Sequence, residues 1–208
     1  MATLSTIRSN IANYLDRTDL NTEITTAINR AITHYGSNVF WFNQGSGTFV
    51  TVASQKAYGT ADGVPTDDAG IDIAQATINS TNFPLYPKTY EFVTLIDTDD
   101  FTGYPEYWAY HDEKIHLYPV PDASYTVSIS YIKKYTDLSL DADTNDFTDN
   151  AEDLIESRAM WWIYKRLLHD RERATEAKED EIDAFNNLKS LTNNRVNLGG
   201  TPLAPTDY

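Results

Sequence analysis

The sequence predicts an α+β fold in which two helix pairs form a bundle and an antiparallel β-rich domain is inserted between them. Apolar residues recur at steps of three and four near both ends of the 208-residue chain, which is the period of an amphipathic helix. Between these ends, apolar and polar residues alternate, as in strands with one buried face. We therefore expect a helix pair at 1–36, a β-rich insertion at 37–147, a second helix pair at 148–192 and an extended C-terminal arm at 193–208.

The first helix pair is predicted from two apolar stripes joined by a short polar connection. The stripe positions are Leu4, Ile7, Ile11 and Leu15, followed by Ile24, Ala27, Ile28, Ala31, Ile32 and Tyr35. Asp19 or Asn21 has the side-chain oxygen that caps the start of a helix, and Gly36 can close one in the left-handed conformation. A connection this short makes the two helices antiparallel neighbours.

Strands are expected in the central region wherever β-branched and aromatic residues alternate with polar ones. The expected strands cover 48–52, 90–96, 106–110, 114–118 and 124–132, with one short strand near 71–78. Asp112 and Glu113 separate two of these runs and predict a tight hairpin turn. Residues 56–88 are rich in Gly, Asp, Asn and Pro, which predicts long loops there.

The second helix pair is predicted to begin at Asp149, which forms a capping box with Glu152, and its last helix is expected to run to about Leu191. The helix after Asp149 is apolar on most sides, as in helices that are buried from more than one direction. One side would pack within the chain and the other against a neighbouring subunit. Trp161, Tyr164 and Leu168 are the candidate subunit-interface residues.

The last segment, 193–208, has no helical period and contains two prolines. An extended arm that orders against a partner is one interpretation, with Leu198, Leu203 and Tyr208 as its anchors. A frayed terminus is the other interpretation.

Composition excludes several classes of protein. The net charge is −15, and residues 37–150 carry five basic and seventeen acidic side chains. Such a surface repels phosphate, which argues against a protein that grips DNA but allows DNA to slide past it. Solubility alone would also explain the charge. No apolar run is long enough for a transmembrane helix, no signal peptide is expected, and the absence of cysteine excludes disulfides.

No catalytic motif stands out, so we expect no enzyme and no cofactor. His111 and His116 could meet across the predicted hairpin, but a zinc site needs a third protein ligand. Asp141, Asp143 and Asn145 alternate as in a calcium loop, but Asp146 stands where such a loop needs glycine. We therefore expect no metal, and interpret these residues as a surface hairpin and a polar connection.

A carbohydrate-binding module is a further alternative, because sugars stack on exposed aromatic rings. Tyr107, Trp108 and Tyr110 would supply such rings, although aromatic residues in alternating strands more often pack a core.

Two parts of the chain carry a resemblance to a known family. In the C-terminal part, 115–191, the matching features are the strand ending Leu117-Tyr118-Pro119-Val120-Pro121-Asp122, the strand from Tyr125 to Lys134 leading to Leu138-Ser139, the helix with Leu154-Ile155-Glu156 and its aromatic run to Tyr164, and the charged helix with Arg171, Arg173, Ala174 and Ala177. In the N-terminal part they are Leu4, Ile7 and Arg8, then Ile24, Ala27, Ile28 and Asn29. Together these features resemble the head-to-tail adaptor (connector) proteins of short-tailed bacteriophages. Residues 56–88 and the tail have no counterpart in this pattern.

The resemblance implies a virion protein at the neck, made in the host cytoplasm. Adaptors of this kind form a ring, usually dodecameric, beneath the portal protein and continue the DNA channel toward the tail or nozzle protein. Their C-terminal arm docks on the portal, so Leu198, Leu203 and Tyr208 would be portal-binding residues. A stopper or a tail-tube-like protein is the alternative within the neck and tail.

Overall fold

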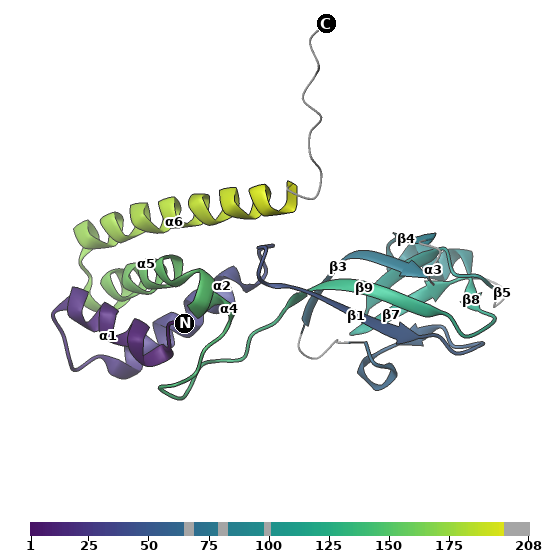
Figure 1. Ribbon diagram of the computed structural model, residues 1–208, viewed down its shortest axis with the longest axis horizontal. Coiled ribbons are helices and arrows are strands. Elements are labelled where there is room, and N and C mark those ends of the chain that lie inside the picture. The colour runs from purple at the N-terminus through teal and green to yellow at the C-terminus, as the bar shows by residue number, and fades with distance from the viewer. Residues whose placement is uncertain (65–68, 79–82, 98–100, 198–208) are drawn as a thin grey trace, which may run out of the picture. The chain divides into compact units, whose positions relative to one another are not determined.

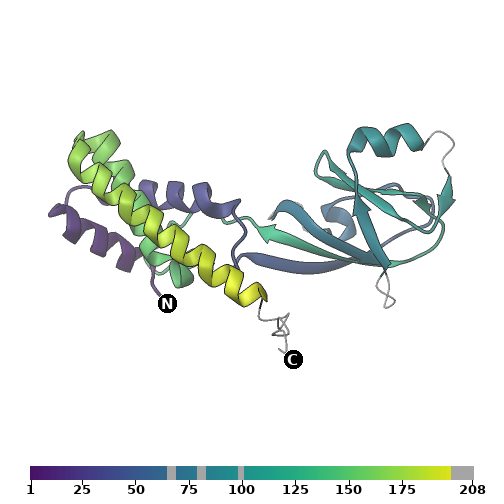
Figure 2. The same ribbon diagram turned by 90° about the horizontal axis from the view of Figure 1, so that it is seen from above.

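The computed structural model describes residues 1–64, 69–78, 83–97 and 101–197 (Figures 1 and 2). The chain divides into two compact units: a helical unit of residues 1–43 with 135–208, and a β unit of residues 44–134. The predicted α+β class is therefore confirmed. The β unit is shorter than the expected insertion at 37–147, because the segments on either side of it pack with the helices.

The N-terminal helices form as the apolar stripes predict. Helix α1 covers Leu4–Leu15 and helix α2 covers Asn21–Gly36, and every predicted stripe position is buried. The predicted caps of α2 are wrong: Leu20 occupies the cap position without a side-chain bond, and Asp19 instead pairs with Arg17 at 2.7 Å. Gly36 ends α2 as predicted, but the following Ser37 is right-handed, so the left-handed freedom of glycine is not used.

The C-terminal helices begin earlier and end later than expected. Helix α4 covers Asp146–Asn150, α5 covers Glu152–Ile163, the π-helical turn η2 covers Tyr164–Leu168, and α6 covers Arg171–Asn197. The capping box is made by Asn145 and Thr148 rather than by Asp149 and Glu152. Since α6 continues to Asn197, the predicted arm cannot begin at residue 193, and residues 198–208 lie outside the described chain.

An aromatic cluster joins distant parts of the helical unit. The Phe147 side chain is fully buried, and its ring meets those of Phe40, Phe42 and Tyr135 edge-on at centroid distances of 6.0, 5.2 and 5.1 Å. Segments more than ninety residues apart thus share one core, which explains why residues 38–43 and 135–147 belong with the helices.

The β unit is built on a seven-stranded sheet in the order β1-β9-β3-β4-β6-β7-β2. Its strands are β1 Gln44–Val50, β2 Ala57–Tyr58, β3 Ala69–Ile78, β4 Phe83–Pro87, β6 Tyr107–His111, β7 Lys114–Tyr118 and β9 Thr126–Lys133. Strands β5 Thr102–Gly103 and β8 Val120–Pro121 form a second, two-stranded sheet. The β4–β6 and β5–β8 pairs are parallel, so the insertion is not antiparallel throughout as expected.

Two local predictions in the β unit have opposite outcomes. The hairpin turn at Asp112 and Glu113 is confirmed, since both residues adopt the left-handed conformation that a tight two-residue turn requires.

The expected strand at 90–96 is wrong. Those residues form helix α3, Tyr90–Ile96, because the Thr89 hydroxyl caps its first turn by accepting from the Phe92 amide.

Candidate interaction surfaces

A cavity of about 750 Å³ lies at the junction of α5, η2 and α6. We call it the Trp161 pocket. Its lining residues are Trp161, Lys165, His169, Arg171, Ala174, Thr175, Lys178 and Glu179. The π-helical turn η2 supplies Lys165 and leads into the left-handed His169, which reverses the chain into α6. Such π-helical turns occur frequently at functional sites.

Three cations surround the Trp161 ring. The Arg158 guanidinium carbon, the Lys165 Nζ and the Lys178 Nζ lie 4.3, 4.5 and 5.6 Å from its centroid. Cations at these distances interact favourably with an indole face. Three basic side chains, Lys165, Arg171 and Lys178, and one acidic side chain, Glu179, line the pocket, so the lining is positive although the whole chain is acidic.

A buried carboxylate fixes two of these cations in place. Glu181 is 1% exposed, and its Oε1 accepts hydrogen bonds from the Tyr35 hydroxyl, from Lys178 Nζ at 2.9 Å and from Arg158 at 3.2 Å. Burial, with the hydrogen bond to Glu181, raises the pKa of Tyr35 and keeps the phenol protonated. The other Glu181 oxygen has no hydrogen-bond partner among the described residues. The positive side of the pocket is therefore anchored in the core.

The three residues expected at a subunit interface lie at this pocket or near it. Trp161 and Leu168 are half-buried and keep an exposed portion. Tyr164 is only 7% exposed and belongs to the core of the helical unit, with the Arg173 guanidinium carbon 5.9 Å from its ring centroid. The expected arm anchors Leu198, Leu203 and Tyr208 lie outside the described residues.

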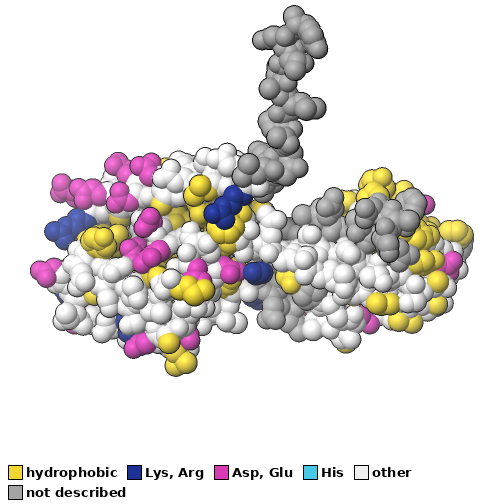
Figure 3. Space-filling model, viewed as in Figure 1, with side chains coloured by type: hydrophobic (Ala, Val, Ile, Leu, Met, Phe, Trp, Pro, Cys, Tyr) yellow, Lys and Arg dark blue, Asp and Glu magenta, His cyan; other side chains and the backbone are white. Residues whose placement is uncertain are grey.

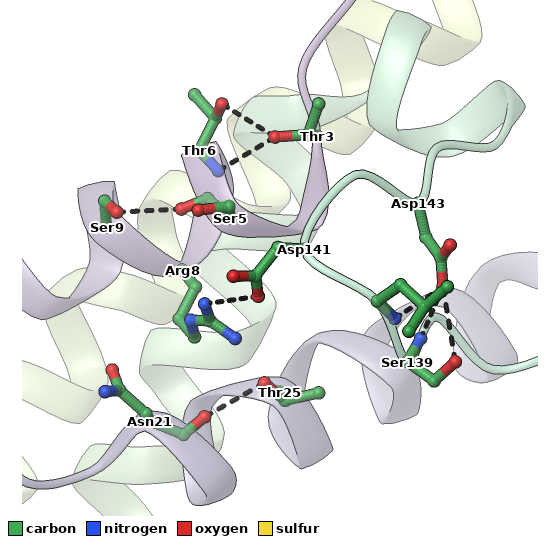
Figure 4. Close-up of polar contacts among 11 residues, drawn as sticks. Thr3, Ser5, Thr6, Arg8, Ser9, Asn21, Thr25, Ser139, Asp141 and Asp143 are labelled. Atoms are coloured by element: carbon green, nitrogen blue, oxygen red, sulfur yellow. Dashed lines mark hydrogen bonds and ion pairs between the residues drawn. The ribbon is translucent and has the colours of Figure 1, made fainter.

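A second surface feature is the acidic loop, residues 137–143, which packs on α1 and α2 (Figure 4). One Asp143 carboxylate oxygen accepts from the backbone amides of Ser139 and Leu140 at 2.7 Å each. These bonds lower the pKa of Asp143. The loop carbonyls of Asp143 and Asp141 accept from the Leu4 and Ser5 amides at 3.0 and 3.1 Å, and so satisfy amides in the first turn of α1.

The same loop is anchored to α2 by one asparagine. The Asn29 side chain accepts from the Leu138 amide and donates to the Leu138 carbonyl, at 2.9 Å in both bonds. The loop thus has a fixed backbone and presents Leu140, which is 68% exposed, beside Asp141.

The residues considered for metal binding have other contacts. Asp141 pairs with Arg8 at 2.7 Å (Figure 4), Asp143 caps its own loop, and Asn145 caps α4. Within the described ranges, no group of three or more His, Asp or Glu side chains is placed to hold a metal ion. The His111 and His116 rings do meet across the hairpin, with centroids 6.2 Å apart.

The ring of Tyr90 in α3 contacts both of these histidines. Its ring stacks on His111 at 4.0 Å and meets His116 edge-on at 4.8 Å. Burial lowers the pKa of His116, so the imidazole is neutral near pH 7.

The aromatic surface of the β unit differs from the expected one. Trp108 is 7% exposed and packs in the core of the β unit, so it cannot offer a face to a sugar. Tyr107 and Tyr110 are half-buried. Exposed rings in this unit include Phe101 as well as Tyr86 and Phe92, and the last two contact Tyr107 at centroid distances of 6.5 and 5.9 Å. Sequence periodicity missed Phe92 because α3 was interpreted as a strand, and Tyr86 because it lies in the stretch expected to form loops. Figure 3 shows hydrophobic side chains on the exposed face of this unit.

Within the described part of the chain, no helix is both long and apolar enough to cross a membrane. Comparison with curated proteins gives no match. The family model described as "SU10 adaptor protein" matches residues 2–205, nearly the whole chain. This match confirms the resemblance to phage head-to-tail adaptors, which the helix pairs and the intervening strands had indicated. The chain belongs to the SU10 adaptor protein family.

Proposed function

We propose that this protein is a structural, non-catalytic head-to-tail adaptor that forms a ring beneath the portal, connects capsid to tail and continues the DNA channel. The family match over residues 2–205 is the observation that carries the proposal. The helical unit supports it with two surface features that suit contacts between subunits, the Trp161 pocket and the exposed Leu140 of the acidic loop.

The protein would act at the virion neck after synthesis in the host cytoplasm, with the portal on one side and a tail or nozzle protein on the other. DNA would pass through the ring without specific binding. The acidic charge favours such passage, because carboxylates repel phosphates. Of the seventeen acidic residues between 37 and 150, twelve are in the β unit, three are in the connection to α4 and two are in α4.

The residues after α6 are proposed to dock on the portal through Leu198, Leu203 and Tyr208, as the family resemblance implies. Trp161 and Leu168 are proposed to face a neighbouring subunit. No cofactor or metal takes part.

Co-sedimentation with the portal tests the proposal. The full chain should sediment with the portal protein of the same phage, and a chain lacking residues 198–208 should keep its fold but lose most of this attachment. The matched control replaces Leu198, Leu203 and Tyr208 by serine at full length, which should weaken attachment to a similar degree.

Three outcomes would change the proposal. A full chain that does not bind the portal would contradict it. Undiminished binding by the shortened chain would contradict the role of the terminal residues. Protection of the C-terminus from proteolysis by the tail, and not by the portal, would favour a stopper or tail-tube-like protein.

A further inference from the structure

We propose that the Trp161 pocket of one copy receives the acidic loop, residues 137–143, of a second copy. In this contact Leu140 packs on Trp161, and Asp137 and Asp141 face Lys165 and Arg171. The inference rests on the proposed function, since it assigns the contact that joins neighbouring subunits of the ring.

The pocket has the chemistry of a site for an acidic segment with one apolar side chain. Lys178 is neutralised by Glu181, but Lys165 and Arg171 have no ion pair within the described residues. Glu179 is the acidic member of the lining, so the wall retains a positive excess. The indole of Trp161 adds an apolar surface that is still partly exposed. A volume of about 750 Å³ lies in the range of pockets that enclose a ligand.

The acidic loop has the complementary chemistry. Leu140 is 68% exposed, and the Asp141 side chain beside it is 73% exposed. Asp137 is also exposed. The Asp141–Arg8 pair lies at the surface, where ion pairs contribute little, so Asp141 can be shared with a second cation.

The loop is also rigid before it binds. Its backbone is fixed by Asn29, by the Asp143 carboxylate and by the first turn of α1. A segment that is already ordered loses little conformational entropy on binding. The hydrogen bonds of the loop backbone thus keep the Leu140 side chain exposed, where it can insert into a neighbouring subunit.

The two surfaces cannot satisfy each other within one subunit. The loop packs on α1 and α2, whereas the pocket is formed by α5, η2 and α6, and Figure 1 shows the connection to α4 and helix α6 on opposite sides of the helical unit. A contact between two different patches of identical subunits is heterologous, and repeated contacts of this type form a ring when the rotation from one subunit to the next closes.

Disulfide trapping tests the contact directly, because the chain has no cysteine of its own. Leu140→Cys and Thr175→Cys are combined in one full-length chain, which is oxidised alone and bound to the portal. A heterologous contact predicts a ladder of cross-linked species larger than dimers. Each single variant can give at most a dimer. The matched control pairs Thr175→Cys with Tyr14→Cys, an exposed position on α1, and should give no ladder.

Charge exchange supplies an independent readout. Lys165→Glu with Arg171→Glu, or Asp137→Lys with Asp141→Lys, should each weaken self-association by about tenfold or more, since like charges then face each other. A mixture of the two variants should recover association, because both contacts between unlike chains are complementary: the exchanged pocket meets the exchanged loop, and the unchanged pocket meets the unchanged loop. Circular dichroism should show an unchanged fold, because all four side chains are exposed.

The outcomes separate this inference from the proposed function. A ladder from the 140–175 pair, with recovery in the mixture, supports the contact. Portal binding without that ladder overturns the contact and leaves the adaptor function standing. Loss of portal binding, but not of self-association, in the pocket variants would assign the pocket to the portal and also overturn the contact. A full chain that binds neither itself nor the portal overturns both.

Discussion

The helical unit and the β unit differ in which parts of the chain supply their cores. The β unit is one continuous stretch, 44–134, and its first and last strands lie side by side, with Gln44 paired to Ile132. The helical unit is assembled from two stretches separated by those ninety-one residues. The β unit can therefore form its core from local sequence, whereas the helical unit needs both ends of the chain.

The aromatic residues show the same difference. In the helical unit, Phe40 and Phe42 come from the first stretch and Phe147 from the second, and none is more than 7% exposed. In the β unit, Phe49 and Tyr58 lie nine residues apart in the sequence and meet at a centroid distance of 5.1 Å. Damage to one stretch should thus unfold the helical unit while leaving the β unit folded.

Ending the chain at residue 134 should have the largest effect. Helices α1 and α2 would lose α5 and the aromatic partners of Phe40, so we expect most helical signal to vanish from the circular dichroism spectrum. Limited proteolysis should leave a resistant fragment close to 44–134. A resistant helical fragment from 1–43 would contradict the interdependence of the two stretches.

Phe147→Ala should lower the free energy of unfolding of the helical unit by about 3–5 kcal/mol, because a fully buried ring leaves a cavity among three other rings. Chemical denaturation followed by tryptophan fluorescence measures the loss. Phe101→Ala is the control, since Phe101 is 60% exposed and its loss should be nearly neutral. Equal effects of the two substitutions would contradict the assigned core.

Tyr58→Phe should destabilise the β unit by about 1–3 kcal/mol. The Tyr58 ring is fully buried, and its hydroxyl donates to the Gln55 carbonyl at 2.8 Å or the Val52 carbonyl at 3.1 Å and accepts from the Val52 amide. Removal of the hydroxyl takes this partner from the Gln55 carbonyl and the Val52 amide, whereas the Val52 carbonyl still accepts from the Gln55 amide. Tyr86→Phe, at a ring that is 56% exposed, should change nothing in the same denaturation experiment. If Tyr58→Phe changed the unfolding of the helical unit and left that of the β unit unchanged, the two cores would not be independent.

Glu156→Gln should give the smallest effect: it should raise the free energy of unfolding by less than about 1 kcal/mol near pH 7. Burial raises the pKa of Glu156 above its ordinary value, although the hydrogen bond from Asn10 opposes the shift. Its contribution to stability is therefore largest below the ordinary pKa and is lost as pH rises through the raised value. Glutamine keeps an acceptor for Asn10 and carries no charge. Denaturation at pH 4 and pH 7 should show the advantage of the variant growing with pH, and a disadvantage at pH 7 would contradict it.

The sequence was sufficient for features with a strong local period. The stripes of α1 and α2, the strands around the 112–113 turn and the α+β class all follow from residue spacing. Sequence patterns failed where tertiary contacts determine the local structure or the burial of a side chain. Tyr90–Ile96 alternates like a strand but is capped as a helix by Thr89, and Tyr164 looks available for an interface but fills its own core.

The candidate surfaces were only partly predictable, for a related reason. Trp161 was identified from its position on an apolar helix, but the cations around it come from α5, η2 and α6. Glu181, which holds Arg158 and Lys178, also accepts a hydrogen bond from Tyr35 of α2. The segment that forms the acidic loop was predicted only as a polar connection. Its rigidity depends on Asn29, which lies 109 residues away in the sequence, and no local pattern signals that pairing.

Electron cryo-microscopy of the portal, with and without this protein, tests the adaptor function most directly. The proposal predicts an added ring of density coaxial with the portal, made of identical subunits, each with a helical and a β-rich part. Portal particles that remain unchanged at saturating protein would contradict it.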